Sequence, residues 1–286
     1  MTIQESREQI RSRLQQNGIE DFEYETWMIL FWKLGVDRAE YFMNPNKIVS
    51  QQKWEEVDSI LKEREQHVPL QYLMGSCEFM GYSFSVDERV LIPRQDTECL
   101  VELAVEKIRK IIADKAGQQT VCKVLDLCTG SGCIGISVKL LCPEAEVTLA
   151  DVSLDALAVA KQNAQSLGAE VQLVQSDLLE QIYDTYDCIL SNPPYIPSAV
   201  IEGLMPEVRV YEPRLALDGR EDGLFFYRKI TQEAGKYLRA GGYLFFEIGQ
   251  EQGEALLSIM KEQEFAETEI KKDLAGLDRI AVGRLL

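Results

Sequence analysis

The spacing of hydrophobic residues divides this chain into three parts. Over residues 1–71, apolar side chains recur every three or four positions, as they do on one face of an α-helix. The pattern predicts three helices: one over 4–17, one from the N-cap Asp21 to Gly35, and one that begins at the N-cap Ser50. We therefore expect a small helical domain over residues 1–71.

Three aromatic residues lie on the apolar faces of these helices. We expect Trp27, Phe31 and Trp54 to fill the core, because a unit of about 70 residues has few other large side chains to bury. A groove that binds a partner protein is the alternative interpretation of this stripe.

Residues 72–93 show a different pattern. Aromatic and polar residues alternate on both sides of Gly81, which predicts two short strands joined by a tight turn. We expect this β-hairpin to link the helical domain to the rest of the chain.

From residue 94 onward, strand and helix patterns alternate. Asp96 or Thr97 is the predicted cap of a helix that Gly117 closes. Seven strands are then predicted, over 121–127, 146–150, 171–174, 188–191, 243–248, 266–271 and 278–285, with helices through 141 and over 153–167, 223–239 and 251–263. Such alternation predicts an α/β fold with a doubly wound, mostly parallel seven-stranded sheet over residues 94–286. The last two strands leave no room for a crossover helix, so the final strand is expected to be antiparallel.

The composition is typical of a soluble globular protein. The chain has 286 residues, of which 46% are hydrophobic and 27% charged, and no apolar run approaches the roughly 18 residues of a membrane span. The first residues, Met1–Glu5, lack the basic start and apolar core of a signal peptide. Seven cysteines without a Cys-x-x-Cys pair and the single histidine, His67, argue against a structural metal and fit a reducing compartment. We expect a cytoplasmic, monomeric protein without a metal and without membrane contact.

The chain is strongly acidic, with a formal net charge of -17. Such a field repels nucleic acid and favours a basic partner. We therefore expect no direct binding of nucleic acid.

A glycine-rich loop lies between the first strand of the predicted sheet and the helix that follows. The stretch Asp126–Gly135 contains Gly-x-Gly-x-x-Gly and opens a helix, where backbone N–H groups can approach a ligand closely. The carboxylate of Asp126 would repel a pyrophosphate but attract the sulfonium and ammonium groups of S-adenosyl-L-methionine, so the loop favours this cofactor over NAD. The candidate cofactor ligands here are Asp126, Cys128, Thr129, Gly130, Ser131 and Gly132.

Two further aspartates follow the next two strands. Asp151 ends the second strand, where a carboxylate can accept hydrogen bonds from both hydroxyls of a ribose. Asp177 follows the third strand, where it can accept from the exocyclic amine of adenine while Leu178 packs on the ring. Each aspartate alone also fits a helix cap or a solvated loop. Three acids at successive strand ends on one edge of a sheet favour a nucleoside site.

The fourth strand ends in Asn192-Pro193-Pro194-Tyr195. The two prolines stop the strand and hold the backbone extended, so the segment forms a stiff platform at the ligand-binding edge of the sheet. The side-chain oxygen of Asn192 and the carbonyl of Pro193 can together hold the two hydrogens of a planar NH2 group, with Asn192 beside the methyl donor. Tyr195 can stack on a flat substrate. Asn192, Pro193 and Tyr195 are therefore the catalytic candidates, all four residues are substrate-binding candidates, and Asn192 is also a cofactor-binding candidate. The reaction indicated is N-methylation of a planar amine or amide.

Together these motifs resemble the class I S-adenosylmethionine-dependent methyltransferases that act on amide or exocyclic nitrogens. Further stretches are Leu91-Ile92-Pro93-Arg94 with Asp96-Thr97-Glu98, Tyr211 to Leu217, Glu221 to Leu224, and Asp273 to Gly276 with Asp278-Arg279. With them, the whole chain is similar to the peptide chain release factor glutamine N5-methyltransferases. Two residues depart from the family pattern: Cys128 stands where glycine is frequent, and Gln95 stands where proline is usual.

The resemblance implies a substrate and a division of labour between the domains. It implies methylation of the glutamine amide in the Gly-Gly-Gln loop of class 1 peptide chain release factors, which modulates translation termination. It also implies that the helical domain helps to bind the release factor. Two alternatives are a nucleic-acid adenine N6-methyltransferase, which the net charge of -17 disfavours, and a non-catalytic scaffold, which an intact Asn-Pro-Pro-Tyr segment disfavours.

Overall fold

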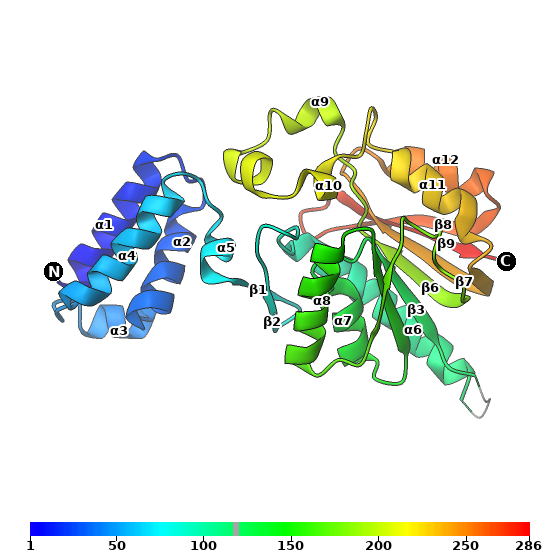
Figure 1. The fold of residues 1–286 in the computed structure, drawn as a ribbon, viewed down its shortest axis with the longest axis horizontal. Coiled ribbons are helices and arrows are strands. Elements are labelled where there is room, and N and C mark those ends of the chain that lie inside the picture. The colour runs from blue at the N-terminus through cyan, green and yellow to red at the C-terminus, as the bar shows by residue number, and fades with distance from the viewer. Residues whose placement is uncertain (117–119) are drawn as a thin grey trace. The chain divides into compact units, whose positions relative to one another are not determined.

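The computed structural model describes residues 1–116 and 120–286, and it contains two compact units (Figure 1). The first comprises Met1–Met74 together with Pro206–Tyr211, and the second comprises Gly75–Met205 and Glu212–Leu286. The division into domains at residues 71 and 93 stays a prediction, and the predicted helix end at Gly117 lies outside the described residues.

The first unit is helical throughout. Its α-helices are α1 (Ile3–Gln16), α2 (Phe22–Ile29), α3 (Arg38–Met43), α4 (Gln51–Arg64) and α5 (Leu70–Met74), and π-helical turns cover Leu30–Leu34 and Glu207–Tyr211. The three predicted helices are present, whereas α3 and α5 were not predicted. Ser50 caps α4, since its side chain accepts from the backbone N–H of Lys53. Asp21 occupies the N-cap position of α2, as predicted, but its side chain makes no capping hydrogen bond.

The core of the first unit is mainly aliphatic. The large, fully buried side chains here include Ile10, Leu14, Ile29, Leu30 and Leu61. Trp27 and Trp54 are partly buried and pack against this cluster.

One predicted core residue lies outside the core of this unit. Phe31 is 64% exposed, so its predicted place in the core is wrong. Leu30 and Leu34 occupy the buried face of this turn, and Phe31 projects to a different side of the helix axis.

A buried ion pair ties the segment Glu207–Tyr211 into the first unit. Arg64 is 1% exposed, and its guanidinium donates to both carboxylate oxygens of Glu25, at 2.8 and 2.9 Å. The same guanidinium also donates to Glu207, and the hydroxyl of Tyr211 donates to the backbone oxygen of Gln66 at 2.7 Å. Burial of these charges is tolerated because each one is paired.

The second unit is built on the predicted seven-stranded sheet (Figure 1). Its strands are β3 (Lys123–Leu127), β4 (Glu146–Asp151), β5 (Gln172–Gln175), β6 (Tyr186–Ser191), β7 (Leu238–Glu247), β8 (Phe265–Lys272) and β9 (Asp278–Leu285). Their order across the sheet is β5-β4-β3-β6-β7-β9-β8. The five strands from β5 to β7 are parallel to one another, and β9 is antiparallel to both of its neighbours, as predicted.

Helices cover both faces of this sheet. The helices of this unit are α6 (Glu98–Asp114), α7 (Cys133–Leu141), α8 (Leu154–Leu167), α9 (Ser198–Ile201), α10 (Arg214–Leu217), α11 (Phe225–Ala234) and α12 (Gly253–Glu262). Alternate residues along a strand point to opposite faces, so Val124 packs in one cluster with α6 to α8, whereas Leu125 packs in another with α11 and α12. The doubly wound fold class is therefore confirmed.

A β-hairpin precedes the sheet, as predicted. β1 (Ser76–Phe79) and β2 (Tyr82–Ser85) pair in antiparallel register through a turn at Met80 and Gly81, whose φ angles are +52° and +75°. Asn163 on α8 fixes this hairpin: its side-chain oxygen accepts from the N–H of Ser85 at 2.7 Å, and its amide group donates to the carbonyl of Ser85 at 3.0 Å.

Three local predictions differ from the structure of the second unit. Neither Asp96 nor Thr97 caps α6 through its side chain; a 3-10 turn over Gln95–Thr97 leads into the helix instead. The helix predicted to reach residue 239 ends at Ala234. The strand predicted to begin at residue 243 begins at Leu238 and includes Gly241 and Gly242. An irregular register between β6 and β7 accommodates those glycines. Over the described residues, no helix has the length and apolar character needed to cross a membrane.

Candidate active site

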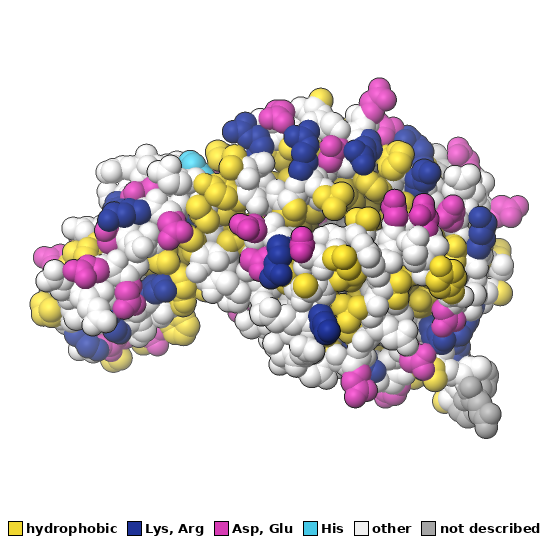
Figure 2. Space-filling view, in the orientation of Figure 1, with side chains coloured by type: hydrophobic (Ala, Val, Ile, Leu, Met, Phe, Trp, Pro, Cys, Tyr) yellow, Lys and Arg dark blue, Asp and Glu magenta, His cyan; other side chains and the backbone are white. Residues whose placement is uncertain are grey.

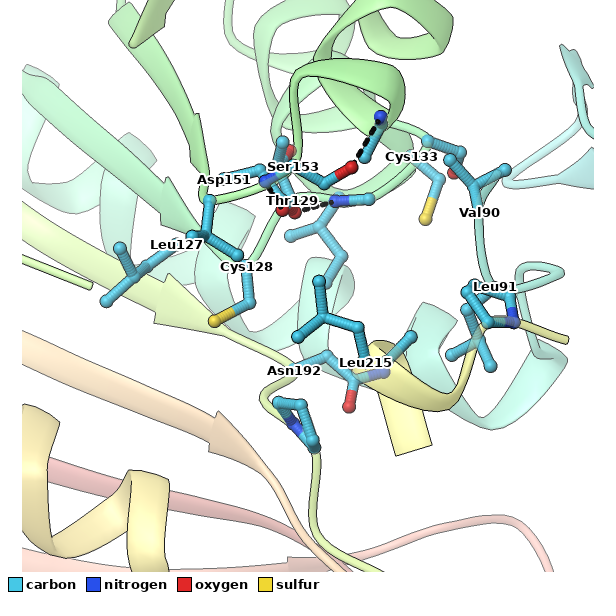
Figure 3. Close-up of a pocket in the computed structure, with 18 of the residues that line it drawn as sticks. Val90, Leu91, Leu127, Cys128, Thr129, Cys133, Asp151, Ser153, Asn192 and Leu215 are labelled. Atoms are coloured by element: carbon cyan, nitrogen blue, oxygen red, sulfur yellow. Dashed lines mark hydrogen bonds between the residues drawn. The ribbon is translucent and has the colours of Figure 1, made fainter. Parts of the chain in front are cut away.

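A pocket lies at the carboxyl ends of the parallel strands, within the second unit. It holds about 1040 Å³ of empty space, part of which is open to solvent. Figure 3 shows Asp151 and Thr129 on one side of this space and Asn192 with Leu215 on the opposite side. This is the position expected for a ligand in an open α/β sheet, where neighbouring βα connections diverge.

The glycine-rich loop forms one wall of the pocket. The N–H of Thr129 donates to the carbonyl of Ala150 at 3.0 Å, and the N–H of Gly132 donates to the carbonyl of Thr129 at 2.8 Å. Gly130 and Gly132 have φ angles of +53° and +82°, which favour glycine. Cys128 has φ +61°, so a side chain occupies a left-handed position where glycine would be unstrained. A glycine at this position would adopt the same φ angle without that strain.

Asp126 supports this loop from behind. Its side chain is fully buried and does not line the pocket, which differs from the prediction that its carboxylate faces the ligand. One carboxylate oxygen accepts from the hydroxyl of Thr129 and from the N–H of Gly135 at 2.9 Å. Burial raises the pKa of Asp126 to about 7, although these two hydrogen bonds act to lower the pKa. Asp126 therefore fixes the shape of the loop.

Gly135 allows helix α7 to pack closely on the sheet. A Cβ atom added there would lie 2.2 Å from Cδ2 of Leu149 and 2.9 Å from Cβ of Asp126, on two neighbouring strands. We expect Gly135→Ala to lower the free energy of unfolding by about 1–3 kcal/mol, because a packed core yields little to an added methyl group. Calorimetric unfolding of the whole chain measures this. Gly203→Ala is the control, since the nearest atom there is 3.5 Å away. Equal transition temperatures for the two variants would contradict the expectation.

Asp151 lies at the end of β4 and faces the pocket. One carboxylate oxygen accepts from the N–H of Gly130 and the other from the N–H of Ser153, both at 2.9 Å. Each carboxylate oxygen can accept a second hydrogen bond, so both remain available to hydroxyl groups of a ligand. Burial raises the pKa of Asp151, and the two backbone N–H groups oppose that rise. Asp177 and Leu178 line the same pocket beyond β5.

The Asn192–Tyr195 segment is held rigidly at the end of β6. The hydroxyl of Ser191 donates to the carbonyl of Leu127 at 2.7 Å and fixes the strand end. Four residues after Ser191, the carbonyl of Tyr195 accepts from the side chain of Gln252 at 3.1 Å. Asn192 and Pro194 line the pocket, whereas Pro193 is buried beside it. The hydroxyl of Tyr195 points to Glu247, at 3.4 Å from Oε1.

Comparisons with known proteins place this architecture in a family. The model of the PrmC N-terminal domain matches residues 5–75, and that of the Methyltransferase small domain matches residues 105–204. The release factor glutamine methyltransferase of Geobacter sulfurreducens is 39% identical over 285 residues, covering 99% of this chain and 97% of that protein. This chain belongs to the release factor glutamine methyltransferase family.

Further relatives agree with this membership. The release factor glutamine methyltransferase of Clostridium acetobutylicum is 36% identical and covers 99% of this chain and 98% of its own length. The fold is shared with the solved T. thermophilus 16S rRNA N2 G1207 methyltransferase in complex with AdoMet and guanosine. That structure has a TM-score of 0.50 and 16% identity, covering 74% of this chain and 50% of its own. The predicted family and enzyme class are therefore confirmed, and S-adenosyl-L-methionine is the methyl donor.

Most predicted site residues of this family member meet in the pocket. Those that line it are Cys128, Thr129, Gly130, Ser131, Asp151, Asp177, Leu178, Asn192 and Pro194. Those that do not line it are Asp126, Gly132, Pro193 and Tyr195. The ligand roles of all these residues stay predictions. Carboxylates at two strand ends, a glycine loop and apolar walls from Leu178 and Phe226 fit a charged nucleoside cofactor.

Sequence reasoning missed a second group of pocket residues. They include Arg89, Val90, Leu91, Pro93, Arg94, Thr97, Pro213, Leu215, Ala216 and Phe226. Several belong to the stretches that carried the family resemblance but received no role. The structure explains why two of these stretches occur together: the guanidinium of Arg94 donates to both carboxylate oxygens of Glu212, at 2.6 and 2.8 Å.

A third stretch of the family pattern joins through Arg279. Its guanidinium lies 3.1 Å from the carboxylates of both Asp96 and Asp273. The loop that follows β8 is thereby attached to the turn that precedes α6. Spatial proximity, which spacing along the chain could not reveal, makes these distant stretches one structural unit around the pocket.

Removal of the Asp151 carboxylate is expected to weaken cofactor binding. Asp151→Ala deletes an acceptor for ligand hydroxyls and frees the N–H groups of Gly130 and Ser153, so the dissociation constant should rise about 10- to 100-fold. Isothermal titration with S-adenosyl-L-methionine measures the effect. Asp155→Ala is the matched control, because Asp155 is an exposed acid one turn into α8. The same affinity in both variants would remove Asp151 from the cofactor site.

Proposed function

We propose that this chain transfers a methyl group from S-adenosyl-L-methionine to the side-chain amide nitrogen of glutamine in the Gly-Gly-Gln loop of class 1 peptide chain release factors. Family membership supports the protein-glutamine acceptor. The observation that carries the proposal is the rigid placement of Asn192 in the pocket wall at the end of β6. Its amide is held opposite Asp151, across the space where a nucleoside fits (Figure 3).

Asn192 and Pro193 are proposed to hold the acceptor. The side-chain oxygen of Asn192 and the carbonyl oxygen of Pro193 accept from the two hydrogens of a primary amide and present its nitrogen for reaction. Their frame does not have to reorganise, because Ser191 and the two prolines fix it in advance. Orientation of this kind can supply several kcal/mol of a reaction barrier. Pro194 and Tyr195 complete the proposed platform.

The glycine loop, Asp151, Asp177 and Leu178 are proposed to hold the cofactor. When bound, S-adenosyl-L-methionine supplies an electrophilic methyl group. Asp151 binds the ribose hydroxyls, and Asp177 with Leu178 binds the adenine. The proton lost from the amide needs no dedicated base, because the methylated amide nitrogen is acidic.

The remaining proposals concern partners and place of action. We propose that the chain acts as a monomer in the cytoplasm, binds release factors partly through residues 1–71, and modulates translation termination. Lys and Arg side chains are interspersed with Asp and Glu on the face shown in Figure 2. With a net charge of -17, such a surface supports a protein substrate over direct binding of nucleic acid.

Intact-mass spectrometry of a class 1 release factor tests the proposed reaction. Incubation with this chain and S-adenosyl-L-methionine should add one methyl group, which peptide mapping should place on the glutamine of Gly-Gly-Gln. An adenine-containing oligonucleotide serves as the competing acceptor in a parallel reaction. Methylation of the oligonucleotide without methylation of the release factor would overturn the proposal in favour of an adenine methyltransferase.

A further inference from the structure

A buried hydroxyl group in the pocket wall lacks a hydrogen-bond partner. Thr97 is 2% exposed and lines the pocket at the end of the turn Gln95–Thr97. Its Oγ1 has no hydrogen-bond partner among the described residues, since it does not cap α6. Buried polar groups are nearly always hydrogen-bonded, so an unpaired hydroxyl in a pocket wall indicates a bond that a ligand completes.

The surroundings of Thr97 show which end of the pocket it occupies. Its hydroxyl is close enough to Glu247 to lower the pKa of that carboxyl group. Glu247 is the last residue of β7, and β7 pairs with β6 so that Phe246 lies opposite Ser191. Glu247 therefore follows directly beside Asn192, at the acceptor end of the pocket and away from the end of β4.

Glu247 is a buried acid near Thr97. It is 1% exposed; its Oε1 accepts from the hydroxyl of Tyr195 at 3.4 Å, and its Oε2 is without a partner among the described residues. Burial raises the pKa of Glu247, and Asp96 adds to that rise, whereas Thr97, Arg279 and Tyr195 oppose it. Oε2 of Glu247 and Oγ1 of Thr97 are thus two buried polar atoms that lie near each other, and neither has a partner among the described residues.

We propose that the hydroxyl of Thr97 donates a hydrogen bond to the carbonyl oxygen of the acceptor amide. This rests on the proposed function and deepens it. Asn192 and Pro193 accept from the NH2 end of a primary carboxamide, and Thr97 donates to its C=O end. The two ends together recognise a carboxamide and fix its orientation. An exocyclic amine, which has no carbonyl on the same carbon, would leave Thr97 unpaired and would bind less well.

Removal of this one hydroxyl is the test. Thr97→Val keeps the shape of the side chain and should lower kcat/KM for the release factor about tenfold, while Thr97→Ser restores most of it. The dissociation constant for S-adenosyl-L-methionine should stay unchanged in both. Thr231→Val is the matched control, because Thr231 on α11 is 1% exposed, its hydroxyl also lacks a partner among the described residues, and it does not line the pocket.

The outcomes separate this inference from the proposed function. An unchanged kcat/KM for Thr97→Val, or a fall matched by Thr231→Val, would overturn the role of Thr97 alone. A parallel loss of cofactor affinity would also overturn it, since Thr97 would then shape the cofactor site. If the unaltered chain does not methylate the release factor, the proposed function fails first and this inference fails with it.

Discussion

Replacement of Asn192 with alanine is expected to abolish methyl transfer to the release factor while leaving the affinity for S-adenosyl-L-methionine nearly unchanged. The side chain of Asn192 supplies the only carboxamide in the pocket wall among the described residues. Without it, one of the two proposed acceptors for the glutamine NH2 group is missing, and the nitrogen loses its orientation. Loss of one preorganised group of this kind lowers kcat by about 10²- to 10³-fold. Single-turnover methylation, followed by intact mass, measures the rate.

The control variant for Asn192→Ala also replaces a carboxamide side chain with alanine, but at a position outside the pocket. Gln165 is an exposed carboxamide on α8, and Gln165→Ala should methylate at the rate of the unaltered chain. Titration with S-adenosyl-L-methionine completes the comparison. If Asn192→Ala lost cofactor affinity and rate to the same extent, Asn192 would bind the cofactor and the acceptor role proposed here would be wrong.

Arg64→Met is expected to cause the largest loss of stability in the helical unit. The guanidinium of Arg64 is 1% exposed and pairs with Glu25 and Glu207, so its removal leaves carboxylates without a counter-charge in a buried site. Breaking a buried pair in this way costs about 3–5 kcal/mol. Urea unfolding followed by tryptophan fluorescence measures the effect. All three tryptophans, Trp27, Trp32 and Trp54, lie in this unit, so the signal reports on it directly.

Arg13 provides the contrast for this prediction. It also pairs with two acids, Asp58 and Glu65, but its side chain is 26% exposed. Arg13→Met should cost about 1 kcal/mol or less, because water screens an exposed pair. A second change, Glu25→Gln in the Arg64→Met background, should recover part of the loss by removing one unpaired charge. Equal losses for Arg64→Met and Arg13→Met would contradict the assignment of Arg64 as a buried structural charge.

The Asn192→Ala and Arg64→Met variants change different parts of the chain, so the first tests methyl transfer and the second tests stability. Asn192 lies in the pocket of the second unit, and Arg64 lies in the core of the first. Arg64 also holds the segment Glu207–Tyr211, which is followed closely in the chain by the pocket-lining residues Pro213, Leu215 and Ala216. We therefore expect Asn192→Ala to have the same free energy of unfolding as the unaltered chain. Arg64→Met should lower the free energy of unfolding even if methylation activity is retained.

The sequence alone determined the fold class and the main chemistry of this protein. Strand patterns ending in Asp151 and Asn192 are local, and the carboxyl ends of parallel strands meet at one edge of a sheet, so the residues of the site could be gathered without coordinates. Glycine at 130 and 132 could likewise be read as a close-approach loop, because positive φ angles favour glycine wherever the loop lies.

Only the tertiary structure decided what depends on burial and on contacts between distant segments. Asp126 was expected to face the ligand, but its carboxylate is buried and supports the loop, since the N–H of Gly135 and the hydroxyl of Thr129 donate to one of its oxygens. Phe31 was expected in the core, but Leu30 and Leu34 take the buried face. Thr97 was expected to cap a helix, but its unpaired hydroxyl lines the pocket near Glu247, 150 residues along the chain. The local sequence pattern determines on which face of a helix or strand a residue lies. The residues that it contacts are determined by packing between segments far apart in sequence.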